Sequence, residues 1–161
     1  MGRGPSQPLR EVEAVTPYRI TVHCSATKNG ESVPISRIRQ WHLDKGWKDI
    51  GYHVVLDVDG SVSLGRPFVE QGAHVEGENE GNIGICLVGT DRFTQEQWKS
   101  LKRQLDNLLI AFDIKEWELH THREFPSAAK QGKTCPGFTT SQLVYWYTAS
   151  DWDAIRGNIL I

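Results

Sequence analysis

The sequence predicts a single α/β domain with a mixed central β-sheet flanked by helices. Strand-like and helix-like segments alternate along the 161 residues without a strict repeat, which favours a sheet with helices packed on its faces. Residues 83–88 form a continuous apolar run, as expected for a strand covered on both faces. Apolar side chains recur at intervals of three and four over residues 98–112, which predicts a helix. A chain of this length closes one hydrophobic core.

The first half of the chain predicts a strand, a short helix and a hairpin. Residues 18–24 alternate in character and are rich in β-branched side chains, which is typical of a strand. After Pro34, apolar side chains recur at helical spacing, and Gly46 is placed to end this helix. Residues 52–66 contain two apolar segments around an Asp-Gly pair, a sequence that favours a tight hairpin turn.

The second half predicts a long helix, a short strand and a weaker helix. Thr94 and Gln97 have the spacing of a capping box, so the long amphipathic helix begins there. A short strand is expected over residues 117–122, followed by a loop with Pro and Gly that extends to Gly137. A further helix is expected from about Thr140.

Both ends of the chain lie outside this pattern. Residues 1–17 contain Gly, Pro, Ser and charged residues without apolar periodicity, which predicts a flexible N-terminal arm. The domain itself is expected over residues 18–150. Residues 151–161 are a C-terminal tail that either packs on the domain or contacts a partner.

Composition excludes several classes of protein. The chain has 18 Lys and Arg against 20 Asp and Glu, so its net charge of −2 provides no overall attraction for nucleic acid. No apolar run approaches the ~20 residues that span a bilayer, so no membrane insertion is expected. The opening residues lack the apolar stretch of a secretory signal, which predicts a soluble protein that starts in the cytoplasm.

The three cysteines do not form a disulfide framework. Cys24, Cys86 and Cys135 cannot all pair within one chain, and thiols stay reduced in the cytoplasm. Cys86 lies inside the apolar run and is interpreted as a small core residue. At least one of the other two needs a different explanation.

A metal ion is one such explanation, because the chain also has six histidines. A catalytic zinc needs three protein ligands and one open position, and its ligands often come from distant strand ends. His23 and His122 each lie at the end of a predicted strand, and Cys135 follows in the next loop. His120 would share a strand face with His122 and is the alternative ligand.

Six short motifs occur together in order between about Tyr18 and Phe138. They are Val22-His-Cys-Ser-Ala26, Trp47 through Gly51-Tyr-His53, Gly72-Ala-His74, Asn82-Ile-Gly-Ile85, His122-Arg-Glu124 and Lys133-Thr-Cys-Pro-Gly137. This set resembles the zinc N-acetylmuramoyl-L-alanine amidases shared by phage endolysins and animal peptidoglycan recognition proteins. The resemblance is closest to the small phage lysozymes that are amidases, and it implies the same α/β fold.

The resemblance implies a residue-by-residue site with one Zn²⁺ per chain. It places the metal ligands at His23, His122 and Cys135. Tyr52 and Lys133 fall on the catalytic positions beside the attacking water and the scissile carbonyl, and His74 resembles a substrate-binding groove residue. The segment between His122 and Cys135 holds 12 residues, which is longer than expected for the shortest phage members and is expected to reshape the groove.

General chemistry agrees with these roles. Zinc polarises an amide carbonyl and lowers the pKa of its water to about 7. Lys133 lies two residues before Cys135, so in an extended segment it shares the same face and can stabilise the oxyanion. The Tyr52 hydroxyl can orient the water or share its proton.

Other polar side chains near these motifs have simpler explanations. His42 is expected to pack within its helix, and His53 to be structural or to support a ligand, because it points away from Tyr52. Glu124 either orients a ligand or forms a surface ion pair.

The resemblance therefore predicts a monomeric phage endolysin that hydrolyses the amide between N-acetylmuramic acid and L-alanine in bacterial peptidoglycan. Such an enzyme would wait in the host cytoplasm until it is released to the cell wall. One alternative is a non-catalytic peptidoglycan-binding protein, which Cys135, Tyr52 and Lys133 together disfavour. Another is an amidase that also binds and inhibits a phage RNA polymerase, for which the N-terminal arm is the candidate contact.

Overall fold

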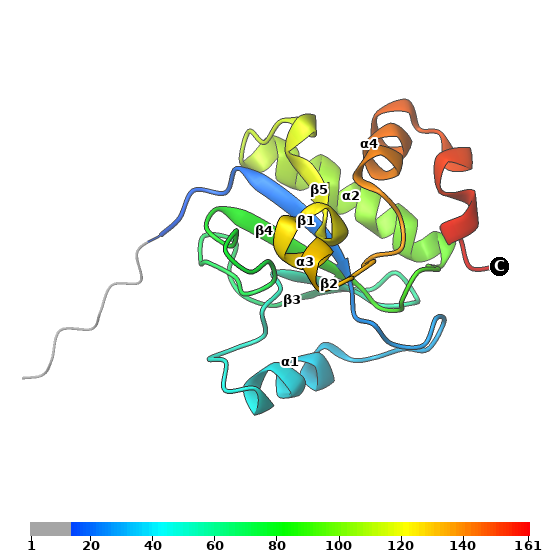
Figure 1. Ribbon diagram of the computed structural model, residues 1–161. Coiled ribbons are helices and arrows are strands. Elements are labelled where there is room, and N and C mark those ends of the chain that lie inside the picture. The colour runs from blue at the N-terminus through cyan, green and yellow to red at the C-terminus, as the bar shows by residue number, and fades with distance from the viewer. Residues whose placement is uncertain (1–13) are drawn as a thin grey trace, which may run out of the picture.

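The computed structural model describes residues 14–161 and shows a five-stranded sheet with strand order β3-β2-β4-β1-β5 (Figure 1). The strands are β1 (Arg19–Cys24), β2 (Val54–Leu56), β3 (Val62–Leu64), β4 (Asn82–Leu87) and β5 (Leu119–Thr121). The α-helices are α1 (Ile35–Asp44), α2 (Gln95–Ala111), α3 (Pro126–Lys130) and α4 (Thr140–Ala149). Three short 3-10 helices are η1 (Glu116–Glu118), η2 (His122–Glu124) and η3 (Trp152–Asn158).

The sheet is mixed, which confirms the predicted fold class. β1 is parallel to β4 and β5, β2 is parallel to β4, and β3 runs antiparallel to β2. The antiparallel pair is the predicted hairpin, with the Gly60 amide donating to the Asp57 carbonyl at 2.8 Å in its turn. Because four strands are parallel, their carboxyl ends lie at one edge of the sheet, which is where open α/β sheets bind ligands.

Helices α2 and α4 cover one face of the sheet. Ile20, Val22 and Cys24 of β1 point to this face, while the residues between them point to the other. Trp98 of α2 and Trp146 of α4 fill the layer and are almost fully buried. The predicted capping box of α2 is present and fixes where this helix begins.

Helix α1 lies on the opposite side of the sheet from α2 and α4 (Figure 1). Its Ile38 packs in a second cluster that includes Val55, Cys86 and Val88. Cys86 is fully buried, so its interpretation as a core residue is confirmed. This face is less apolar near β1 and β4, because the sheet also carries Thr21 and His23 there.

The segment after β5 differs from the prediction of a continuous loop. Helix α3 forms within it, and the strand predicted over residues 117–122 is shortened by η1 and η2. Pro126 starts α3 because a proline has no amide to satisfy in the first turn of a helix. Ala128 is buried beneath the helix, and Gly132 follows with φ +65°.

Both predicted terminal segments contact the domain where they are described. Residues 1–13 of the predicted arm lie outside the described residues, but the Val15 amide donates to the Val69 carbonyl at 2.8 Å. In the tail, Ile155 is fully buried and Ile159 forms a β-bridge with Phe93. Within residues 14–161, no helix combines the length and the apolar character needed to cross a membrane.

Packing of α2 should dominate stability. Leu105 is fully buried and Ile110 is 84% exposed on the same helix. Leu105→Ala is expected to lower the free energy of unfolding by about 2–5 kcal/mol through lost burial and a cavity. Ile110→Ala should change it by no more than about 0.5 kcal/mol. Urea denaturation of both variants measures this, and equal losses would contradict the assignment of the core.

Candidate metal centre and active site

The strand register explains how His23 and His122 meet although 98 residues lie between them. In the parallel pair of β1 and β5, Val22 lies opposite Thr121. His23 and His122 are the next residues along each strand, at the carboxyl edge of the sheet. Their ring centroids are 4.5 Å apart. His122 begins η2, so the chain turns away immediately after placing this ring.

Cys135 joins the two histidines from the loop after α3. One donor atom from each of His23, His122 and Cys135 lies within 4.8 Å of the others. The Cys24 amide donates to the Cys135 Sγ at 3.0 Å, and the Arg123 amide donates to the Cys135 carbonyl at 2.9 Å. These backbone bonds attach the cysteine to the ends of both histidine-bearing strands.

The donor set fits a divalent zinc ion. Burial lowers the pKa of His122 to about 4 and the pKa of His23 well below its usual value, so both rings are neutral and offer a lone pair. The Cys24 thiol and burial raise the pKa of the Cys135 thiol, so a thiolate here requires a cation beside it. Imidazole nitrogen and thiolate sulfur are both zinc ligands, and three protein ligands leave the fourth position of a tetrahedral zinc open.

Tyr52 lies next to this cluster, just before β2. Its ring centroid is 5.2 Å from that of His23 and 5.5 Å from that of His42. Burial, with the neighbouring cysteines, raises the pKa of the Tyr52 phenol well above its usual value. The hydroxyl therefore stays protonated at neutral pH and can donate a hydrogen bond.

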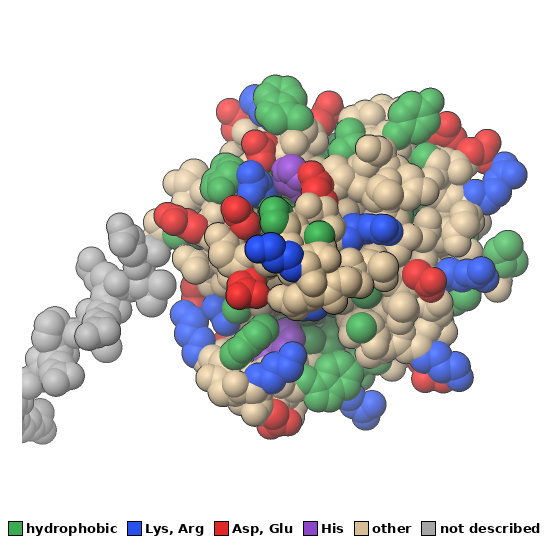
Figure 2. All heavy atoms as spheres, viewed as in Figure 1, with side chains coloured by type: hydrophobic (Ala, Val, Ile, Leu, Met, Phe, Trp, Pro, Cys, Tyr) green, Lys and Arg blue, Asp and Glu red, His purple; other side chains and the backbone are tan. Residues whose placement is uncertain are grey.

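Two grooves meet at the cluster, and His122 and Lys133 line both. The first, of about 470 Å³, lies between α1 and the Cys135 loop, and its lining includes Trp41, Lys45 and Tyr52. The second, of about 420 Å³, lies between α3 and the segment after β3, and its lining includes Trp47 and His74. Figure 2 shows one patch of histidine atoms at the surface of this face, just above α1.

His74 lines the second groove, but both of its ring nitrogens are engaged inside the protein. Its Nε2 lies 2.7 Å from the Asn82 carbonyl oxygen, and its Nδ1 lies 2.8 Å from Nε2 of His23. Burial lowers the pKa of His74 to about 3, so the ring is neutral. Neither nitrogen is free to hydrogen-bond a substrate, so contact with one would be through the ring carbons that line the groove. The substrate-binding role of His74 stays a prediction.

Comparison with known proteins identifies the family of this chain. The family model described as N-acetylmuramoyl-L-alanine amidase matches residues 13–138. The chain belongs to the N-acetylmuramoyl-L-alanine amidase family. Its predicted family membership and amidase activity are therefore confirmed.

Individual relatives of the amidase agree with this assignment. It is 39% identical to the endolysin of Escherichia phage T7 over 127 residues, which are 74% of this chain and 80% of that protein. It is 42% identical to the endolysin of Enterobacteria phage K11 over 131 residues, or 76% and 82% of the two chains. Among solved structures, the amidase LysC from Clostridium intestinale superposes with a TM-score of 0.70 at 26% identity, covering 81% and 84% of the chains.

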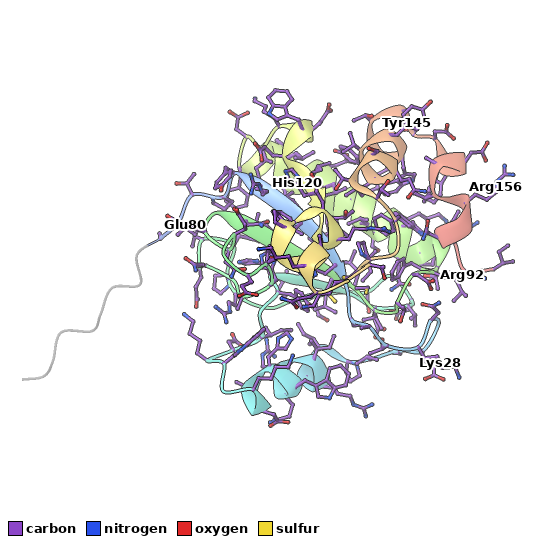
Figure 3. All side chains as sticks on the ribbon, viewed as in Figure 1. Lys28, Glu80, Arg92, His120, Tyr145 and Arg156 are labelled. Carbon is purple, nitrogen blue, oxygen red and sulfur yellow. The ribbon has the colours of Figure 1, made fainter. Side chains whose placement is uncertain are left out.

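The remaining histidines of the amidase lie outside the three-donor cluster. His120, the alternative ligand, is labelled in Figure 3. Its ring nitrogens lie 3.5 Å from the Glu118 carboxylate and 3.1 Å from the Glu124 carboxylate. The Glu124 carboxylate also accepts from the Thr140 hydroxyl, which favours the surface-contact interpretation of this residue. His53 accepts from the Gly84 amide at 3.0 Å and lies 2.8 Å from the Glu70 carbonyl oxygen, so it is structural.

Several features of the site were beyond the sequence analysis. The backbone bond from Cys24 to Cys135 carries no side-chain signal in the sequence. The lining of the first groove by Trp41 and Lys45 depends on where α1 lies against the sheet. The contact of His74 with His23 could have been suspected from Gly72 and Gly84, because both glycines lie in the motifs and leave room for a ring.

His42 gives the amidase a testable pH dependence. It is 8% exposed, and its Nδ1 accepts from the Gly51 amide at 2.8 Å. Burial, with the charges of Lys45 and Arg66, lowers the pKa of His42 to about 4. The unfolded chain, with a pKa near 6.5, therefore binds this proton first as the pH falls. The stabilising effect of the neutral ring is complete above about pH 6.5 and is lost as the pH falls to about 4.

The variant His42→Asn keeps an acceptor for the Gly51 amide but does not titrate. Between pH 6.5 and 4.5, the free energy of unfolding is expected to fall less steeply in this variant than in the wild type, by at most about 1.4 kcal/mol per pH unit. Urea denaturation in one chelator-containing buffer series measures both slopes. Identical slopes would show that His42 is not neutral in the folded protein.

Proposed function

We propose that this amidase is a zinc-dependent endolysin that hydrolyses the bond between N-acetylmuramic acid and L-alanine in bacterial peptidoglycan. The convergence of the His23, His122 and Cys135 donor atoms within 4.8 Å carries the zinc assignment. The endolysin role is supported by the relatives named endolysins in phages T7 and K11, which match about four fifths of their own length. As an endolysin, the enzyme would wait in the host cytoplasm until it is released to the wall.

The three donors would hold the ion at the point where the two grooves meet. Zinc bound there would polarise the scissile carbonyl and lower the pKa of its bound water, so that hydroxide is available at neutral pH. A substrate bound in either groove would reach the ion, because Lys133 and His122 line both of them. A substrate whose sugar and peptide extend in opposite directions from the reacting carbon fits two grooves that meet at one point.

Lys133 and Tyr52 supply the remaining chemistry. The Lys133 side chain is exposed and its charge acts on both His23 and His122, so its ammonium would lie near a carbonyl bound beside these rings. It would stabilise the negative charge that develops on the carbonyl oxygen. The protonated Tyr52 hydroxyl would orient the water or the carbonyl through a hydrogen bond.

Two further expectations remain predictions. Inhibition of a phage RNA polymerase is tied to the N-terminal arm, whose residues 1–13 lie outside the described part of the chain. The monomeric state is likewise a prediction, and sedimentation measures it.

Two measurements on the same samples test the proposal: the zinc bound per chain and the peptides released from peptidoglycan. Wild-type amidase is expected to bind one zinc per chain and to release peptides with N-terminal L-alanine from purified peptidoglycan. Cys135→Ala should lose most bound zinc and nearly all release, because it removes one of three ligands. His120→Ala is the matched control and should retain both.

Two results would count against the proposal. Zinc-loaded wild type that binds peptidoglycan fragments but releases no peptide would support a peptidoglycan-binding protein instead. Full zinc content and release in Cys135→Ala would overturn the ligand assignment.

Lys133 should affect hydrolysis without affecting the metal. Lys133→Ala is expected to keep its zinc and to lower kcat about 10²- to 10³-fold, since it removes one stabilising charge from the transition state. Lys130→Ala, on the exposed side of α3, is the control and should leave kcat unchanged. A loss of zinc in Lys133→Ala would instead give this residue a structural role.

A further inference from the structure

A buried hydrogen-bond chain connects strand β4 to the metal centre. The Asn82 carbonyl lies 2.7 Å from His74 Nε2, and His74 Nδ1 lies 2.8 Å from His23 Nε2. His23 is 1% exposed and His74 is 9% exposed, so water does not compete effectively for these bonds. The chain therefore links a fixed backbone group to a metal-ligand ring through a single side chain.

The chemistry of the groups fixes the direction of each bond. A carbonyl oxygen only accepts, so the proton of His74 must be on Nε2. A neutral imidazole has one N–H, so His74 Nδ1 can only accept. His23 must then donate from its Nε2, which leaves the lone pair of its Nδ1 for a metal. Local hydrogen bonding alone thus selects one tautomer of His23.

The backbone around His74 is held as firmly as its ring. The amides of His74 and Val75 both donate to the Asn79 Oδ1 at 2.8 Å. The Asn82 side chain accepts from the Thr21 hydroxyl at 2.8 Å, two residues before His23 on β1. His74 is therefore fixed relative to the same strand that carries the ligand.

Two glycines make the space for this ring. A Cβ on Gly84 would lie 2.7 Å from His74 Cγ and Cδ2, and a Cβ on Gly72 would lie 2.8 Å from His74 Cδ2. Real Cβ atoms do not approach a ring this closely, so any larger residue at either place would displace it. The ring planes of His23 and His74 are at 86°, with centroids 4.9 Å apart.

We infer that His74 is a positioning residue of the metal centre: it holds the His23 ring with the proton on Nε2 and Nδ1 directed to the ion. This inference rests on the proposed zinc function but concerns a residue outside the three-donor cluster, whose two ring nitrogens both bond within the protein. Hydrogen bonds of this kind to metal-ligand histidines usually change metal affinity 10- to 100-fold when removed.

A matched pair of substitutions separates the two bonds of His74. In His74→Asn, the amide oxygen replaces Nδ1 and retains an acceptor for His23. In His74→Gln, the longer amide replaces Nε2 and retains the bond to the Asn82 carbonyl, while the acceptor for His23 is lost. Zinc dissociation constants are measured by competition with a chelating dye, and the unfolding midpoint of each variant reports its fold.

His74→Gln is expected to weaken zinc binding about 10- to 100-fold, and His74→Asn by no more than about threefold. Long-range ¹H–¹⁵N NMR provides an independent signature in zinc-free wild type, where His23 should carry its proton on Nε2. In His74→Gln this preference should be lost.

Equal zinc affinity in the wild type and both variants would overturn the inference, as would a His23 proton on Nδ1 in the wild type. A wild type that binds no zinc would overturn the proposed metal function. The tautomer measured by NMR would still decide whether His74 positions His23. The two failures are therefore distinguishable.

Discussion

The parallel register of β1 and β5 is the constraint on which the site depends. Because Val22 lies opposite Thr121, the next residues of both strands place imidazole rings side by side at the carboxyl edge of the sheet. The loop after α3 adds the sulfur through backbone bonds to the ends of these two strands. A slip of the β1–β5 pairing by one residue would turn one ring to the opposite face and separate the donors.

Burial gives this arrangement its chemical character. The histidines of the cluster are neutral because a charged ring would be poorly solvated there, and the Cys24 thiol together with burial raises the pKa of the Cys135 thiol. Neutral imidazole nitrogens and a thiol with a raised pKa attract one another only weakly. They are nevertheless suitable ligands for a divalent cation. The exposed Lys133 places a positive charge close enough to both rings to lower their pKa values further.

Much of the fold and the cluster could be predicted from the sequence, because periodicity and capping are local signals. The helix after Thr94, the hairpin and the strand ending at Cys24 all follow from such signals. Helix α3 was not predicted, because its five residues are too few for periodicity to show. Gly72 and Gly84 in the motifs leave room for a ring, but the contact of His74 with His23 also depends on how the loop after β3 packs against β4.

The C-terminal tail, residues 151–161, is part of the folded core. The family match ends at residue 138, yet the indole N–H of Trp98 donates to the Asn158 carbonyl at 3.2 Å, and Ile155 is fully buried. A shortened enzyme that stops at the family boundary would lose α4 and leave the largest core side chain with an unpaired donor. The segment that matches the family is therefore shorter than the segment that the protein needs to complete its core.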